Sequence, residues 1–314
     1  MAMSSLSAST RKLRTRMSDL VAAAGNPQLS WNLVQDVTQL FDYAFSRNAF
    51  AAGTIVAVVA GAVGYFVVLR GLAFAGHALS HIGFAGAAGA VVVGVNAISG
   101  LLLFTIASGA TMGALGHRIR NRDVVIGIVL AWVLGLGVLF ITLYSGYATE
   151  AYSILFGEIY GVTGNALLIT LLAGVFTLAA LALIYRPLLF SSIDEDVAES
   201  RGVPVRLLSV GFMVLLALAV SEAVQVVGVL LVFALVVTPA AIAERLTARP
   251  AAGIALACVL ALVFTWLGLA IAYYSPHPPS FFITTIAFAS YLSTRAWMWL
   301  RGRQRTGRRI LQAA

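Results

Sequence analysis

Long apolar runs follow one another, with only short polar segments between them, over most of the 314 residues. A bilayer-spanning helix needs roughly 20 predominantly apolar residues, and these runs suit that length. The second run is rich in glycine, and the seventh follows the sixth with little room for a turn. The pattern predicts an all-α, polytopic helical membrane protein with eight or nine transmembrane helices. Their approximate limits are 49–69, 72–95, 98–116, 124–145, 165–185, 206–226, 227–246, 252–274 and 281–300.

The segments that flank this block have other patterns. In residues 29–46, apolar side chains recur at helical spacing opposite polar ones, which predicts an amphipathic helix lying along the membrane surface. Residues 1–28 are serine-rich and basic, and we expect a disordered N-terminal tail there. Residues 301–314 form a second basic tail, which we expect in the cytoplasm.

Composition supports the membrane assignment and excludes several functions. Hydrophobic residues make up 61% of the chain and charged residues 10%, against about 25% charged in an average soluble domain. The net charge of +8 is read as topology and contact with anionic lipid, because no nucleic-acid module is visible. The single lysine, Lys12, lacks the glycine-rich context of a phosphate-binding loop, so we expect no ATP hydrolysis and no enzyme activity from this chain itself.

Charge in the connecting segments predicts the orientation. Residues 117–122, 244–249 and 301–309 are basic, whereas 146–164 and 273–280 contain no Arg or Lys. The positive-inside rule puts the first group in the cytoplasm and the second outside. With nine spans the basic N-terminus then lies outside, which the rule disfavours. A second segment that does not span would remove this conflict, and so would a long tail tolerated on the outer side.

Two imidazoles interrupt the second apolar run. His77 and His81 lie four residues apart, so they share one helix face and can together bind one metal ion. Ionisable residues within a span usually face a cavity or the bundle interior. The competing interpretation is structural, with Ser80 and preceding carbonyls as hydrogen-bond partners of the rings. Glu222, at the end of the sixth run, is a further candidate for the metal pathway.

The cytoplasmic segment 185–204 differs from the others because it is acidic. Its pattern predicts a short helix with Ser191 or Ser192 as N-cap, acids in the first turn, and Arg201 with Gly202 at the end. One interpretation is a solvated surface helix, and the other is a docking element for a partner.

Four motifs together resemble the membrane-spanning permease subunit of metal-ion ABC importers of the zinc, manganese and iron type. They are the apolar run and Arg at 67–70 followed by Gly-His-Ala-Leu-Ser-His at 76–81, Leu-Phe-Gly-Glu at 155–158, the acidic segment 194–203, and the run from 227 to Thr-Pro-Ala-Ala at 238–241. The resemblance extends from about residue 50 to about residue 295.

This resemblance implies partners and site residues. It implies a homodimer in the bacterial inner membrane, with a cytoplasmic ATP-binding subunit and an extracellular metal-binding protein. Residues 49–300 would form the permease domain, and a coupling helix at about 191–202 would dock on the ATPase. The docking residues would be Asp194, Glu195, Asp196, Glu199, Arg201 and Gly202. The binding protein would contact Glu150, Glu158 and His277.

The chain also departs from the family pattern, in which Asp is usual at the position of His77. An all-nitrogen pair suits zinc, whereas carboxylate oxygen favours manganese, so the sequence predicts transported zinc first, with manganese or iron as alternatives. No permanently bound cofactor is expected.

Two other classes compete with the importer. A proton-coupled secondary metal transporter usually shows internal repeats, and none is evident here. An intramembrane metallopeptidase needs His-Glu-x-x-His, and Ala78 occupies the position of the Glu.

Overall fold

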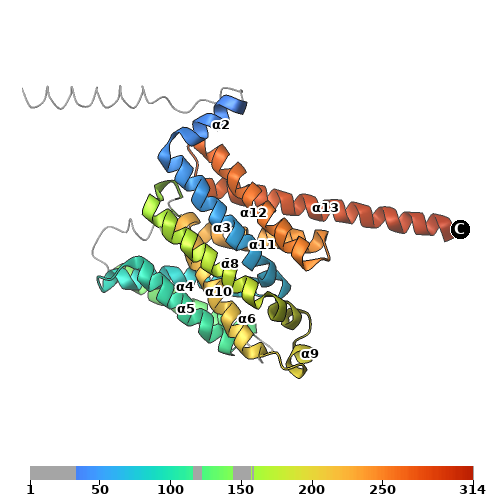
Figure 1. Ribbon diagram of the computed structural model, residues 1–314, viewed down its shortest axis with the longest axis horizontal. Helices are drawn as coiled ribbons and strands as arrows, with labels where there is room; N and C mark the ends of the chain where they lie inside the picture. Colours follow the sequence, from blue (N-terminus) through green and yellow to red (C-terminus); the bar gives the residue numbers. More distant parts are fainter. Residues whose placement is uncertain (1–32, 116–121, 144–156, 158, 314) are drawn as a thin grey trace, which may run out of the picture.

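The computed structural model describes residues 33–115, 122–143, 157 and 159–313. This part of the chain is helical and contains no strand (Figure 1). In chain order the elements are α2 (Leu33–Asp42), α3 (Ala44–Leu69), α4 (Ala73–Val92), α5 (Ala97–Leu115), α6 (Arg122–Leu143), the 3₁₀ turn η1 (Ile159–Gly161), α8 (Gly164–Ile193), α9 (Glu195–Ser200), α10 (Val205–Val227), α11 (Val229–Leu246), α12 (Pro250–Tyr273) and α13 (Pro279–Ala313).

A helix occupies each of the nine segments that the apolar pattern predicts. Six of these helices are long and apolar enough to cross a membrane, namely α3, α5, α6, α8, α10 and α12. By length and apolar composition, α4, α11 and α13 are not among them. Helix α4 corresponds to the glycine-rich second run, and α11 to the seventh run, which follows the sixth with little room for a turn. The all-helical class is thus confirmed, and the count of eight or nine spans stays a prediction.

The observed helices differ from the predicted limits at two points. Helix α8 continues through Pro187 to Ile193, whereas the apolar run ends at 185. A proline removes its own N–H from the ladder and crowds the carbonyl four residues earlier, but the turn beyond it is held by Leu188, which is fully buried. Helix α13 continues through the basic tail to Ala313, so this tail is an extension of the last helix.

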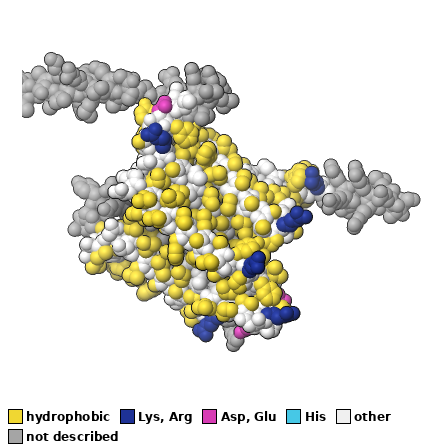
Figure 2. All heavy atoms as spheres, viewed as in Figure 1, with side chains coloured by type: hydrophobic (Ala, Val, Ile, Leu, Met, Phe, Trp, Pro, Cys, Tyr) yellow, Lys and Arg dark blue, Asp and Glu magenta, His cyan; other side chains and the backbone are white. Residues whose placement is uncertain are grey.

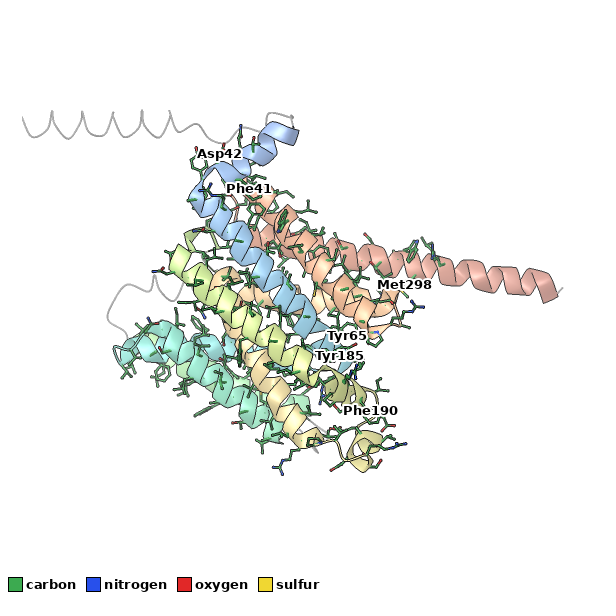
Figure 3. All side chains as sticks on the ribbon, viewed as in Figure 1. Phe41, Asp42, Tyr65, Tyr185, Phe190 and Met298 are labelled. Atoms are coloured by element: carbon green, nitrogen blue, oxygen red, sulfur yellow. The ribbon has the colours of Figure 1, made fainter. Side chains whose placement is uncertain are left out.

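Hydrogen bonds define the two ends of the bundle. At one end, the amide of Asn48 donates to Val162 O at 3.0 Å, and the Tyr273 hydroxyl donates to Gln39 O at 3.2 Å. At the other end, Arg70 Nη1 donates to Ser191 Oγ at 3.3 Å. We call them the α2 end and the α9 end. Figure 3 labels Phe41 and Asp42 near the first, and Tyr65, Tyr185 and Phe190 toward the second.

Successive long helices of the described residues run in alternate directions between these two ends. Helix α4 leaves the α9 end, and α5 returns to it, because Gly113 near the end of α5 packs on Val210 near the start of α10. The turn after Leu246 therefore lies at the α9 end, and the turn after Tyr273 lies at the α2 end. Helix α2 shares its end with the turn that has no Arg or Lys.

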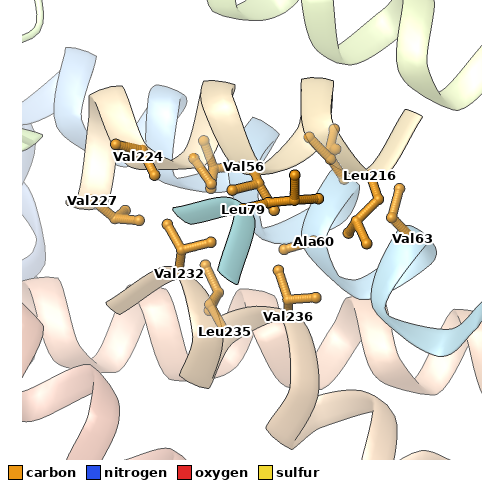
Figure 4. Close-up of a cluster of buried hydrophobic side chains, with 14 of the residues drawn as sticks. Val56, Ala60, Val63, Leu79, Leu216, Val224, Val227, Val232, Leu235 and Val236 are labelled. Carbon is orange, nitrogen blue, oxygen red and sulfur yellow. The ribbon is translucent and has the colours of Figure 1, made fainter. Parts of the chain in front are cut away.

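Helices α3 and α10 form the centre, and 72% of the most apolar stretch of each helix is buried. Between them and α11 lies an aliphatic cluster into which α4 inserts Leu79 (Figure 4). The backbones approach closely where α3 has glycine, since a Cβ at Gly61 would overlap the Cys258 backbone of α12 and one at Gly64 would overlap Val236 O of α11. Small residues that permit such contact are typical of membrane helix interfaces.

The outer helices bury far less of their surface. Only 17% of the most apolar stretch of α6 and 22% of that of α8 is buried within the chain. Figure 2 shows a face dominated by hydrophobic side chains, with the few charged ones toward its margins. Such a face suits lipid or a second copy of the chain, because an exposed apolar surface of this extent is unfavourable in water.

Candidate metal pathway and coupling surface

The histidine pair lies in the first half of α4, directly after a tight turn. Helix α3 ends in a Schellman motif, in which Leu72 N–H donates to Val67 O at 2.7 Å and Gly71 N–H donates to Val68 O at 3.0 Å. Gly71 has φ +66°, a conformation that glycine adopts at little cost. This turn starts α4 at the α9 end and fixes which way its faces point.

One face of α4 packs into the core, and another carries the two histidines. Leu79 is fully buried, whereas His77 and His81 are both half-buried. Their ring centroids are 4.6 Å apart with an interplanar angle of 80°. The His77 ring also makes an edge contact with Phe233 of α11, at 5.1 Å between centroids. The structure thus brings the two imidazoles together on a partly open surface beside α11.

The competing interpretation, in which Ser80 and preceding carbonyls are hydrogen-bond partners of the two rings, can be compared with the observed hydrogen bonds. The Ser80 hydroxyl donates to Gly76 O at 3.1 Å, so its proton is used within the helix. His77 Nδ1 is buried and has no hydrogen-bond partner. This nitrogen therefore makes none of the hydrogen bonds that the structural interpretation requires.

Glu222 does not complete this site. Within the described residues, no group of three or more His, Cys, Asp or Glu side chains is placed to hold a metal ion. The carboxyl of Glu222 lies instead between α10 and α8, next to Gly174. A single chain in this conformation therefore offers two nitrogen ligands, and further ligands must come from water, a second copy or a partner.

The acidic segment forms α9, but its N-cap is not the predicted serine. Ser191 and Ser192 both lie within α8, where their hydroxyls donate to Leu188 O at 3.0 and 2.6 Å. Asp194 is the N-cap, and its Oδ1 accepts from Val197 N–H at 2.9 Å. The prediction of a serine cap was wrong because α8 continues past Pro187 and uses both serines first.

The end of α9 follows the predicted pattern. Gly202 has φ +79°, and its N–H donates to Glu199 O at 3.0 Å while Val203 N–H donates to Ala198 O at 3.1 Å. Ala198 is fully buried and fixes the helix to the bundle. All six residues expected to dock on a partner are exposed at this end, namely Asp194, Glu195, Asp196, Glu199, Arg201 and Gly202.

The predicted outer-face residues are only partly covered by the structure. Glu150 and Glu158 lie outside the described residues. His277 is exposed in the turn between α12 and α13 at the α2 end, with its Nδ1 2.8 Å from Ser275 Oγ. Gly157, in the Leu-Phe-Gly-Glu motif, has φ +74°, and a Cβ there would overlap the backbone at Val227 and Gly228. Gly157 therefore packs directly against the α10–α11 junction, a role that sequence reasoning missed.

Comparison with known proteins now identifies the family. The model of the ABC 3 transport family matches residues 42–297. The chain belongs to this family. It is 33% identical over 239 residues to the manganese transport system membrane protein MntC of Halalkalibacterium halodurans, which covers 76% of this chain and 82% of the relative. It is 34% identical over 212 residues to the manganese import system permease protein ScaB of Streptococcus parasanguinis, covering 67% and 75%.

Solved structures agree with this assignment. The structure of PsaBC from Streptococcus pneumoniae in complex with Fab matches with a TM-score of 0.74 and 31% identity, over 83% of this chain and 95% of that one. An inward-facing putative metal-chelate type ABC transporter matches with a TM-score of 0.67 at 17% identity, which shows a shared fold. The chain is therefore the permease subunit of a metal ABC importer, a transport component and not an enzyme. The secondary-transporter and peptidase alternatives give way to this assignment.

Proposed function

We propose that the chain works as a homodimer in the bacterial inner membrane and carries a divalent transition metal past His77 and His81. The observation that supports this most is the buried, unpartnered Nδ1 of His77 beside the second imidazole. Two ligands per chain hold an ion weakly enough for it to leave, as conduction requires. The half-open face of α4 leaves room for a second copy to supply further ligands.

The transported metal is manganese or zinc, and different observations favour each. The relatives named above are manganese permeases, which makes manganese the first candidate. The zinc expectation from the sequence is not confirmed by these names. The pair itself contains no carboxylate, and two imidazoles suit zinc better, so zinc is the second candidate.

The two ends of the bundle have separate roles in this proposal. The α9 end faces the cytoplasm, where a separate ATP-binding subunit docks on α9 and its exposed acidic residues. The α2 end faces outward and receives the ion from an extracellular metal-binding protein, near Glu150, Glu158 and His277. With nine spans, the N-terminus lies on the outer side. ATP binding then moves α9, and through α8 and α10 it changes which side of the membrane the histidine pair faces.

Uptake of labelled manganese and zinc into proteoliposomes tests the proposal. The complete importer with His77→Ala and His81→Ala together should lose ATP-dependent uptake, while the dimer and its ATPase subunit still co-purify. Ser80→Ala is the matched control, because this residue lies between the two histidines and its hydroxyl bonds only within α4. Unaltered uptake in the double variant would mean that the pair is structural.

A further inference from the structure

Glu222 is a carboxylic acid buried within a membrane-spanning helix and outside the histidine site. It lies in α10, with 5% of its surface exposed. Neither of its carboxyl oxygens has a hydrogen-bond partner. Its neighbours in sequence are satisfied, because Ser221 Oγ lies 2.6 Å from Thr105 Oγ1 of α5 and the Gln225 amide donates to Ser221 O. The unpartnered group is therefore the acid itself.

The surroundings of the carboxyl are backbone and aliphatic side chains. A Cβ at Gly174 of α8 would lie 3.1 Å from Glu222 Oε1, and 2.8 and 3.2 Å from the γ-methyl carbons of Ile55 and Val59 of α3. The missing side chain at Gly174 thus makes the room that the carboxyl occupies. Water has little access to this position, since Val59 is also buried.

The charged groups on the packed helices are distant from this position. The only other charged residues of the three helices are Arg47 in α3, Arg186 in α8 and Arg206 in α10. At 1.5 Å per residue, Arg206 is about 24 Å along α10 from Glu222, and the other two are about 18 Å from Val59 and Gly174. The remaining titratable groups on helices packed against α10 lie on α4, α11, α9, α3 and α8. They are His77 and His81 of α4, Glu244 and Arg245 of α11, Glu195, Asp196 and Glu199 of α9, and Tyr65 and Tyr185 toward the α9 end.

An ionised carboxylate at this place would have no counter-charge and no donor. Removing such an ion from water without a partner costs several kcal/mol, whereas a neutral acid costs much less. We propose that Glu222 is an intramembrane proton-binding site, whose carboxyl carries a proton while α8 packs on α10 at Gly174 and releases it to water when that contact opens. In the release the O–H bond breaks, and the proton passes to water. This site is separate from the histidine pair and does not depend on which metal is carried.

Infrared spectroscopy of the purified importer in lipid tests the proposal directly. A protonated carboxylic acid has a carbonyl stretch that an ionised carboxylate lacks, and this band shifts in heavy water. The wild type at about pH 7 should show such a band, although exposed carboxyl groups are ionised there. Glu222→Gln should remove it. Glu244→Gln is the matched control, because Glu244 is exposed at the end of α11, and it should leave the band unchanged.

A second variant covers the case in which Glu222→Gln does not fold. Glu222→Asp keeps the acid but shortens the side chain, so the band should persist at a shifted frequency. A wild type without the band would overturn the proposal, and so would a band that neither Glu222 substitution alters. Both results are independent of metal uptake, so failure here leaves the proposed transport function standing.

Discussion

A substitution at Gly202 tests whether the conformation of α9 controls coupling between this chain and the ATP-binding subunit. Its φ of +79° lies in the left-handed region, and a Cβ added there would meet no atom within 4 Å. Gly202→Ala therefore changes the backbone preference without a steric clash. A non-glycine residue pays roughly 1–2 kcal/mol in this conformation. A helix of six residues is not stable by itself, so this cost directly destabilises the C-terminal end of α9.

A cost of this size lowers the ratio of folded to unfolded α9 by a factor of roughly 5 to 30. Hydrogen exchange of the Gly202 and Val203 amides, which donate to α9 carbonyls, should accelerate by that factor in Gly202→Ala. The amount of ATP-binding subunit that co-purifies and its metal-stimulated ATPase activity should fall in parallel. Gly202→Asn should restore both, because Asn adopts the left-handed conformation more readily.

Gly211→Ala is the control, since Gly211 lies inside α10 and an added Cβ there also meets no atom within 4 Å. It should leave exchange and coupling unchanged. Equal co-purification of the ATP-binding subunit with Gly202→Ala and Gly202→Asn would refute the idea that the end of α9 governs docking. Faster exchange without loss of the subunit would show that the helix is described correctly but does not dock.

Two further outcomes follow from the structure. His77→Asp replaces one nitrogen ligand by carboxylate oxygen, so competition uptake should shift toward manganese over zinc relative to the wild type, and an unchanged ratio would remove His77 from the selectivity site. Burial, with a smaller contribution from Tyr273, raises the pKa of Tyr160 in η1 from 10.0 to about 12. The phenol donates to Leu269 O at 3.0 Å, so the folded state should lose stability only as the pH rises from 10 toward 12. Tyr160→Phe should reduce that alkaline loss in thermal unfolding, and an identical profile would contradict the assignment.

The helices could be predicted from sequence because apolar run length decides membrane helices almost alone. The limits failed where packing overrides a local signal. Pro187 indicates a helix end, yet α8 continues because the following turn buries Leu188. The same extension moved the cap of α9 from a serine to Asp194. The helix pairing that places Gly64 against α11 depends on distant contacts, which no single-sequence pattern contains.

The candidate site was predictable only in part. The spacing of His77 and His81 fixes their common face, because both lie on one helix, and the structure places the rings together. The location of Glu222 could not be derived in this way, since its neighbours come from α3 and α8, far away in sequence. The sequence shows an acid at the end of an apolar run, which favours a residue of the metal pathway. The structure instead packs this carboxyl against α3 and α8, apart from the histidine pair.

X-ray absorption at the metal edge tests the central claim most directly. The complete importer would be trapped with manganese or zinc in the membrane, and the ligand shell of the ion measured with and without His77→Ala and His81→Ala. The account predicts imidazole nitrogen scattering in the wild type and its loss in the double variant. A shell of oxygen ligands alone, or a nitrogen signal that survives removal of both histidines, would contradict it.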